Sequence, residues 1–108
     1  MSEKVVVNEI VLLTVIVEKT HKDSLIALLS EAGGQLINTI YGKDLAREET
    51  GFLKEALGLV SKETRLVVTC LLPSEESGPM LKTLIEKFDL DKPNTGAAFT
   101  VPVETLSF

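Results

Sequence analysis

Two turns in this 108-residue sequence combine glycine with lysine in a way that suits phosphate binding. One is Gly42-Lys43, and the other is the turn-rich segment 91–96, with the sequence Asp-Lys-Pro-Asn-Thr-Gly. Main-chain N–H groups of such turns bind a phosphate group together with one or two ammonium charges. Neither turn matches the P-loop or the Rossmann fingerprint, so each taken alone is more typical of an ordinary turn.

The other residues that could carry chemistry do not form a catalytic or metal-binding pattern. The chain has a single histidine, His21, and a single cysteine, Cys70, whereas a zinc site needs several such ligands. We expect His21 at the start of a helix and Cys70 in a central strand, where both are structural and the thiol lacks the exposure of a nucleophile. The acid pairs Glu48-Glu49 and Glu75-Glu76 lie in polar sequence and are predicted to be solvated. The sequence therefore predicts no catalytic residue, no metal and no cofactor, and a protein that is not an enzyme.

The charge balance excludes one class of partner. Lys and Arg total 11 against 16 Asp and Glu, which gives a net charge of −5 and a sequence pI of about 4.8. Nucleic-acid binders usually carry a basic surplus, so nucleic acid is not expected as a partner. The sequence shows no signal-peptide pattern and no membrane-spanning apolar segment, and one cysteine fits a reducing compartment. We therefore expect a cytoplasmic protein.

Hydrophobic periodicity predicts four strands, at residues 10–17, 36–41, 66–72 and 98–103. A helix is predicted between the first two strands, capped by Thr20 or Asp23 and stopped by Gly33-Gly34, and a second helix before the last strand, with Pro79 in its first turn. The expected apolar stripes are Leu25, Ile26, Leu28, Leu29 and Ala32 in the first helix, and Leu81, Leu84, Ile85 and Phe88 in the second. This order predicts an α+β fold, a single domain over residues 1–108 with a ferredoxin-like β-α-β-β-α-β sandwich.

The first and third strands are predicted to lie in the centre of the sheet and to be apolar on both faces. In the first strand, Leu12 and Ile16 point to one face while Leu13 and Val15 point to the other. Two helices cover one face only, and soluble monomers avoid exposing the other. We therefore predict a homo-oligomer built through the sheet face, the alternative being that residues 5–7 or the long loop cover it. Pro102 places the last strand at an edge.

A long loop, residues 43–64, separates the second and third strands where a hairpin would suffice. Apolar residues at helical spacing predict that this loop is partly helical, with a mixed charged face beside the apolar one. One hypothesis is a partner-docking arm; the alternative is a short helix packed on its own domain or on a neighbouring subunit. The residues predicted to contact a partner are Arg47, Phe52, Leu53 and Leu57.

The layout resembles that of the nitrogen-regulatory PII signalling proteins over nearly the full chain. The similarity is carried by Thr39-Ile40-Tyr41-Gly42-Lys43, by the long loop that follows, and by Gly96-Ala97-Ala98-Phe99-Thr100-Val101-Pro102-Val103-Glu104. The resemblance implies a trimer with nucleotide clefts between subunits, an effector such as ATP, ADP or AMP, and a protein target. It places phosphate contacts at Gly42, Lys43, Lys92, Asn94, Thr95 and Gly96.

The sequence also departs from the family pattern. The segment 91–96 is poorer in glycine, the long loop has no tyrosine to modify, and the family's C-terminal arginines have no counterpart. The leading hypothesis is a non-enzymatic regulator that senses a small molecule between subunits and acts on a target through the 43–64 loop. The alternative is a constitutive oligomeric interaction protein without a ligand. An acylphosphatase-like enzyme ranks below both, because neither Arg47 nor Arg65 lies in a glycine-rich cradle.

Overall fold

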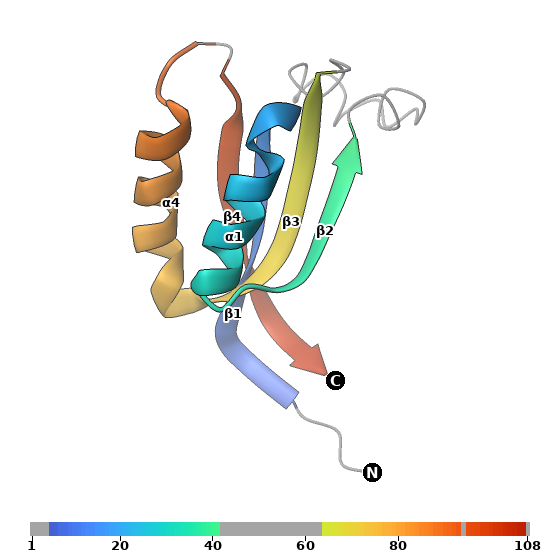
Figure 1. Cartoon of the computed structure of the whole chain (residues 1–108). Coiled ribbons are helices and arrows are strands. Elements are labelled where there is room, and N and C mark those ends of the chain that lie inside the picture. The colour runs from blue at the N-terminus through green and yellow to red at the C-terminus, as the bar shows by residue number, and fades with distance from the viewer. Residues whose placement is uncertain (1–4, 42–63, 94, 108) are drawn as a thin grey trace, which may run out of the picture.

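The computed structural model of the chain describes residues 5–41, 64–93 and 95–107. Its elements follow the predicted order, and none of the helices in these ranges is long and apolar enough to cross a membrane (Figure 1). The elements are strand β1 (Val5–Glu18), the 3-10 turn η1 (Lys19–His21), helix α1 (Lys22–Glu31), strand β2 (Gln35–Tyr41), strand β3 (Arg65–Pro73), helix α4 (Ser74–Phe88) and strand β4 (Ala97–Ser107).

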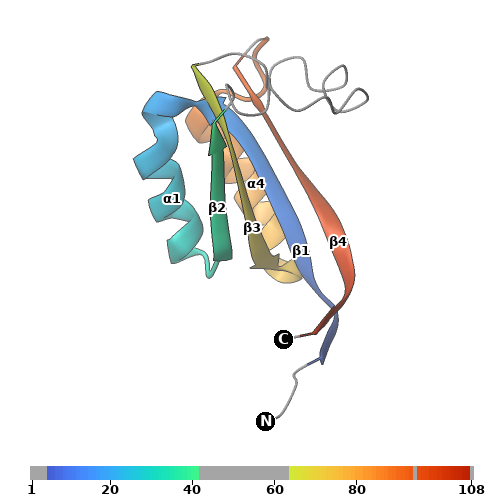
Figure 2. The ribbon, with the colours of Figure 1, turned by 90° about the vertical axis from the view of Figure 1, so that its right-hand side faces the viewer.

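The strands form one antiparallel four-stranded sheet in the order β2-β3-β1-β4. This order confirms that the first and third strands are central. It also confirms the edge position of the last strand, where Pro102 pairs with Val11 of β1. Figures 1 and 2 together show α1 and α4 on the same side of the sheet, so the domain has two layers.

The core lies between the helices and one face of the sheet. Alternate residues of the central strands point into it, because successive side chains of a strand face opposite ways. The buried contributors are Val11, Leu13, Val15 and Val17 of β1, Leu66, Val68, Cys70 and Leu72 of β3, Leu25 and Leu29 of α1, and Met80, Leu84 and Phe88 of α4.

The other face of the sheet, which we call the open face, has no helix over it among the described elements (Figure 2). The strand register places on it Ile10, Leu12, Thr14 and Ile16 of β1, Val67, Thr69, Leu71 and Pro73 of β3, Asn38 and Ile40 of β2, and Ala97, Phe99, Val101 and Val103 of β4. The same register places the ion-paired Glu18 and Arg65 at the end of this face, and none of its other residues listed here is charged. Phe99 is 39% exposed and Val101 48% exposed, so large apolar side chains remain in contact with solvent within one chain.

Strands β1 and β4 are longer than predicted. The sequence indicated residues 10–17 and 98–103, but the two strands continue to pair at Val5↔Ser107 through a register shift between Val7 and Ile10. Main-chain hydrogen bonds hold this extension, and such bonds do not require an alternating pattern of side chains. Figure 1 shows the paired ends reaching beyond the helices.

The predicted helix starts were wrong. The residue before α1 is His21, whose carbonyl accepts a hydrogen bond from the hydroxyl of Ser24, and neither Thr20 nor Asp23 caps the helix. The reason is that β1 runs directly into a 3-10 turn, which delays the helix to Lys22. Pro79 lies inside α4 and not in its first turn, because that helix already begins at Ser74.

The predicted apolar stripe of the second helix was wrong at one position. Ile85 is 40% exposed, whereas Met80, which the stripe omitted, is buried at 6%. Met80, Leu84 and Phe88 are four residues apart and therefore share one side of the helix, while Ile85 lies about 100° around from Leu84. The predicted helix within residues 43–64 lies outside the described residues.

Gly96, at the entry to β4, is required by close packing of two backbones. Its φ is +149°, and a Cβ placed there would lie 2.1 Å from the carbonyl oxygen of Ile16. We expect Gly96→Ala to lower the free energy of unfolding by about 2–4 kcal/mol, measured by chemical denaturation.

Gly78 provides the matched control for this substitution. It lies inside α4, and a Cβ there would meet nothing within 4 Å. Gly78→Ala should raise stability by about 0.5–1 kcal/mol, because alanine loses less backbone entropy in a helix. Equal effects at the two glycines would contradict the close approach of Gly96 to β1.

Candidate ligand site at one end of the sheet

Antiparallel pairing brings several functional candidates to the same end of the sheet. The ends of β1 and β2 and the starts of β3 and β4 meet there, as do the start of α1 and the end of α4 (Figure 1). Of the residues predicted to contact phosphate, the structure describes Lys92, Thr95 and Gly96 at this end. The remaining predicted contacts lie outside the described residues: Gly42, Lys43 and Asn94 for phosphate, and Arg47, Phe52, Leu53 and Leu57 for a partner.

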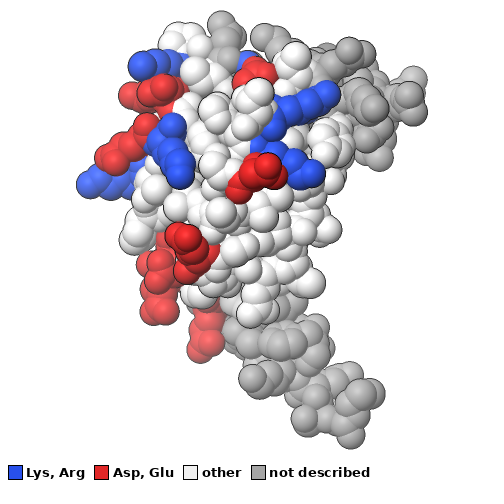
Figure 3. Space-filling view, in the orientation of Figure 1, with Lys and Arg blue, Asp and Glu red and all other residues white. Residues whose placement is uncertain are grey.

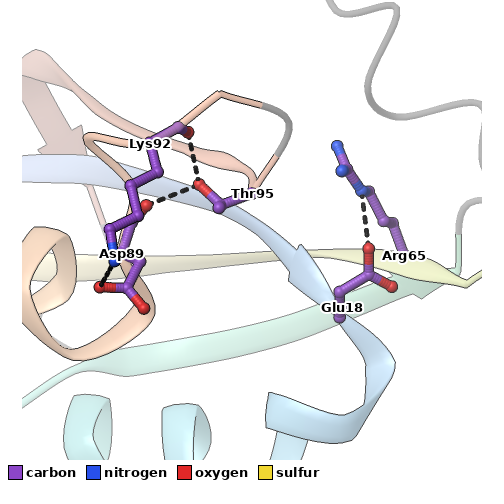
Figure 4. Close-up of polar contacts among 5 residues, drawn as sticks. All are labelled: Glu18, Arg65, Asp89, Lys92 and Thr95. Atoms are coloured by element: carbon purple, nitrogen blue, oxygen red, sulfur yellow. Dashed lines mark hydrogen bonds and ion pairs between the residues drawn. The ribbon is translucent and has the colours of Figure 1, made fainter.

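The segment 89–96 between α4 and β4 is held closed by its own hydrogen bonds. Helix α4 ends at Phe88, and Asp89 adopts a left-handed conformation with φ 54°. The carbonyl of Asp89 accepts bonds from the main-chain N–H of Lys92 at 2.9 Å and from the hydroxyl of Thr95 at 2.7 Å. The same hydroxyl lies 2.9 Å from the carbonyl of Lys92 (Figure 4). These polar groups of the turn therefore bond to one another.

The charges of the same segment are also internally compensated. The ammonium of Lys92 lies 3.4 Å from the carboxylate of Asp89, and both side chains are more than half exposed. Asp91 adds a second acid, so the three charged residues sum to −1. A phosphate bound here must compete with Asp89 for Lys92. Because exposed ion pairs are worth about 0–1 kcal/mol, that competition is feasible.

The described residues beside the two predicted turns lie at opposite edges of the sheet. Tyr41, directly before Gly42, ends β2 at one edge of the sheet, and Gly96 precedes β4 at the other edge. Two strands lie between these edges, and at about 4.8 Å per strand step the separation is roughly 14 Å. One phosphate group therefore cannot contact both Tyr41 and Gly96 of the same chain.

Arg65 is the one buried charged side chain among the described residues, and the sequence did not predict that it would be buried in an ion pair. It is 2% exposed, and its Nε donates to Oε1 of Glu18 at 3.1 Å. The two residues are register partners at the ends of β3 and β1. Figure 4 shows this pair apart from the Asp89 turn, so Arg65 belongs to an ion pair and not to that turn. The sequence signal that could have predicted this ion pair is the presence of opposite charges, Glu18 and Arg65, at the ends of two strands expected to pair.

Tyr41 has basic neighbours that the sequence analysis also missed. Lys22 Nζ donates to the hydroxyl of Tyr41 at 3.0 Å, and Lys19 Nζ lies 5.8 Å from the centre of its ring. The hydrogen bond to Tyr41 is the main cause that raises the pKa of Lys22 above its ordinary value. Since α1 begins at Lys22, the start of this helix is attached to the end of β2.

His21 and Cys70 both pack against other parts of the fold. The ring of His21 packs on that of Phe88 with 4.9 Å between centroids, which connects the start of α1 to the end of α4. Cys70 is buried in β3, and burial raises the pKa of its thiol. The described residues contain no group of three metal-ligating side chains.

Comparison with known proteins identifies the fold. No protein-family model and no curated protein sequence matches the chain. Among solved structures, the apo form of CPII from Thiomonas intermedia K12, a nitrogen regulatory PII-like protein, matches with a TM-score of 0.66. The two chains are 16% identical, and the match covers 99% of each.

Two further structures agree with this match. A PII-like signalling protein of Thermus thermophilus gives a TM-score of 0.59 at 15% identity, covering 100% of this chain and 92% of the other. Arabidopsis thaliana PII bound to citrate gives 0.55 at 15% identity, covering 90% and 79%. The chain therefore has the fold of PII-like proteins, as its resemblance to that family implied.

The ion pair between Glu18 and buried Arg65 should contribute more stability than the exposed pair. We expect Glu18→Gln to cost about 1–3 kcal/mol in chemical denaturation, because a buried guanidinium loses its charged acceptor. Asp89→Asn is the control, since it removes the carboxylate from the exposed pair with Lys92 and should cost less than about 1 kcal/mol. A cost for Glu18→Gln no larger than for Asp89→Asn would contradict this assignment.

Proposed function

We propose that this chain is a divergent PII-type regulator and not an enzyme. In this proposal it senses a small molecule between subunits in the cytoplasm and acts on a target protein through the 43–64 loop. The observation that carries the proposal is the extent of the fold similarity, which spans 99% of this chain and 99% of CPII. The burial of Cys70, the one thiol of the chain, agrees with a non-catalytic role.

The open face supports assembly as a homo-oligomer, with a trimer as the expected form. Its central rows are uncharged, and Leu12, Phe99 and Val101 are each more than a third exposed in the single chain. Burying apolar surface contributes about 25 cal/mol per Å², so covering this face is favourable. The proposed occupant is a second copy of the same chain. The net charge of −5 makes copies repel elsewhere, so an uncharged patch is where they approach most easily.

An adenine nucleotide is the first effector to test. CPII structures with this fold have been solved with ADP, AMP and bicarbonate, at 19% identity and a TM-score of 0.59. In this chain, Lys92 supplies an ammonium beside Thr95 and Gly96 in the turn before β4. We propose that nucleotide phosphates displace Asp89 from Lys92, with Lys43 as the second expected contact.

A constitutive interaction protein is the second candidate. The observation that favours it is the closed turn of residues 89–96, where the Thr95 hydroxyl and the Lys92 ammonium already bond within the turn. A turn built in this way is stable without a ligand. In this version the oligomer is permanent and the 43–64 loop is a fixed docking surface.

The oligomer is tested by placing a charge on the open face. Phe99→Glu should reduce the mass in light scattering from that of an oligomer to that of a monomer, because a carboxylate cannot be buried there without a partner. Ile85→Glu is the matched control, since Ile85 is 40% exposed and Phe99 39%, but Ile85 lies on α4 in the helical layer. A monomeric wild-type protein, or equal effects of both variants, would argue against assembly through the sheet.

The effector is tested by calorimetry with ATP, ADP and AMP. We expect saturable binding near one nucleotide per subunit and about tenfold weaker binding in Lys92→Ala, since one charge-assisted contact is lost. Lys82→Ala, an exposed lysine on α4, should leave the affinity unchanged. An oligomer that binds none of the three nucleotides would favour the constitutive interaction protein.

A further inference from the structure

The hydroxyl end of Tyr41 lies within a cluster of basic side chains. Lys22 Nζ is 3.0 Å from the hydroxyl oxygen and 5.5 Å from the ring centre, so this ammonium lies beyond the hydroxyl and not over the ring face. Lys19 Nζ is 5.8 Å from the same ring centre. The side chains come from η1, α1 and β2, three elements that the fold brings together at one end of the sheet.

This cluster presents hydrogen-bond donors and positive charge. One ammonium proton of Lys22 is used by the Tyr41 oxygen, which leaves its other protons, those of Lys19 and the phenolic proton as donors. Neither lysine forms an ion pair with a carboxylate in the described part of the chain. Glu18, which precedes Lys19 in the chain, pairs with Arg65, and the exposed Asp23 influences Lys22 through space without forming an ion pair.

The basic cluster is unusual in a chain with a net charge of −5. Figure 3 shows basic side chains interspersed with acidic ones toward the upper part of the viewed face, whereas only acidic ones are seen among the described residues at its lower end. The turn 89–96 at the opposite edge of the sheet carries two acids and one lysine. At this end of the sheet, the two lysines beside Tyr41 therefore attract an anion more strongly than the turn with Asp89, Asp91 and Lys92 does.

We propose that Lys19, Lys22 and Tyr41 form a site for a phosphate group, separate from the turn at residues 89–96. Two ammonium groups match the charge of about −1.5 to −2 that a phosphate monoester carries at neutral pH, and the phenolic proton supplies a third contact. Tyr41 is the last described residue before the 43–64 loop. A phosphate bound here therefore acts at the point where that loop leaves the sheet. The proposal does not depend on nucleotide binding.

The fluorescence of Tyr41 can be used to measure phosphate binding at this site. It is the only tyrosine of the chain, and the chain has no tryptophan, so the intrinsic tyrosine fluorescence comes from Tyr41 alone. The experiment titrates the full-length protein with inorganic phosphate and, separately, with glycerol phosphate, against sodium chloride at matched ionic strength. We expect a saturable fluorescence change with a phosphate compound and none with chloride. A change with inorganic phosphate alone identifies the free ion, and a change with both identifies a site that accepts monoesters.

Lysine substitutions test whether phosphate binds at Lys19 and Lys22 and not at other lysines of the chain. Lys19→Ala leaves the bond between Lys22 and Tyr41 intact and should weaken phosphate binding about tenfold, and the double variant Lys19→Ala/Lys22→Ala should abolish the response. Lys82→Ala on α4 is the control and should respond as wild type, with circular dichroism checking that every variant is folded. The proposal is overturned if phosphate acts no differently from chloride, if the double variant responds as wild type, or if Lys92→Ala removes the response. Nucleotide binding through Lys92 would survive each of these outcomes.

Discussion

The central strands β1 and β3 are apolar on both faces, and the two described helices, α1 and α4, both cover the same face. Toward α1 and α4, residues such as Leu13 and Val68 are fully buried and form the core. On the open face, Leu12 and Phe99 keep more than a third of their surface exposed. Burial is completed within the chain on the helix-covered face, whereas on the open face it is partial, because Ile16 and Val67 are buried and Leu12, Phe99 and Val101 are not. The proposed oligomer would bury these remaining apolar side chains.

The charged end of the sheet is organised around the same strands. Glu18 and Arg65 are register partners and form an ion pair at the ends of β1 and β3. Beyond this pair, the main-chain N–H of Lys19 donates a hydrogen bond to the carbonyl of Thr64, which continues the pairing of the two strands. On one side of this pair, the start of α1 contributes the Lys22 ammonium to the hydroxyl of Tyr41. On the other side, the turn before β4 pairs its lysine with Asp89. The two edges of one sheet therefore differ in the charged groups that they present.

The fold was predictable from the sequence to a large extent, whereas the element ends were not. Continuous apolar runs around Leu13 and Val68 marked the central strands, because burial on both faces requires apolar residues at consecutive positions. Helix starts depended on how the preceding strand ended, and the 3-10 turn before Lys22 left no local signal. The extension of β1 toward Val5 depended on pairing with β4. Main-chain pairing of that kind is indifferent to the hydrophobic pattern.

In the candidate site, too, some features were predictable from the sequence and others were not. The sequence by itself determined that the segment around Lys92 is a turn, since proline and glycine restrict the backbone locally, and it placed Cys70 in a buried strand. Only the tertiary structure decided that Lys92 pairs with Asp89, that Gly96 meets the Ile16 carbonyl, and that Lys22 reaches Tyr41 across 19 positions of sequence. Such contacts arise from the packing of elements against one another. That packing leaves no periodic trace in the sequence, so spacing alone could not have revealed them.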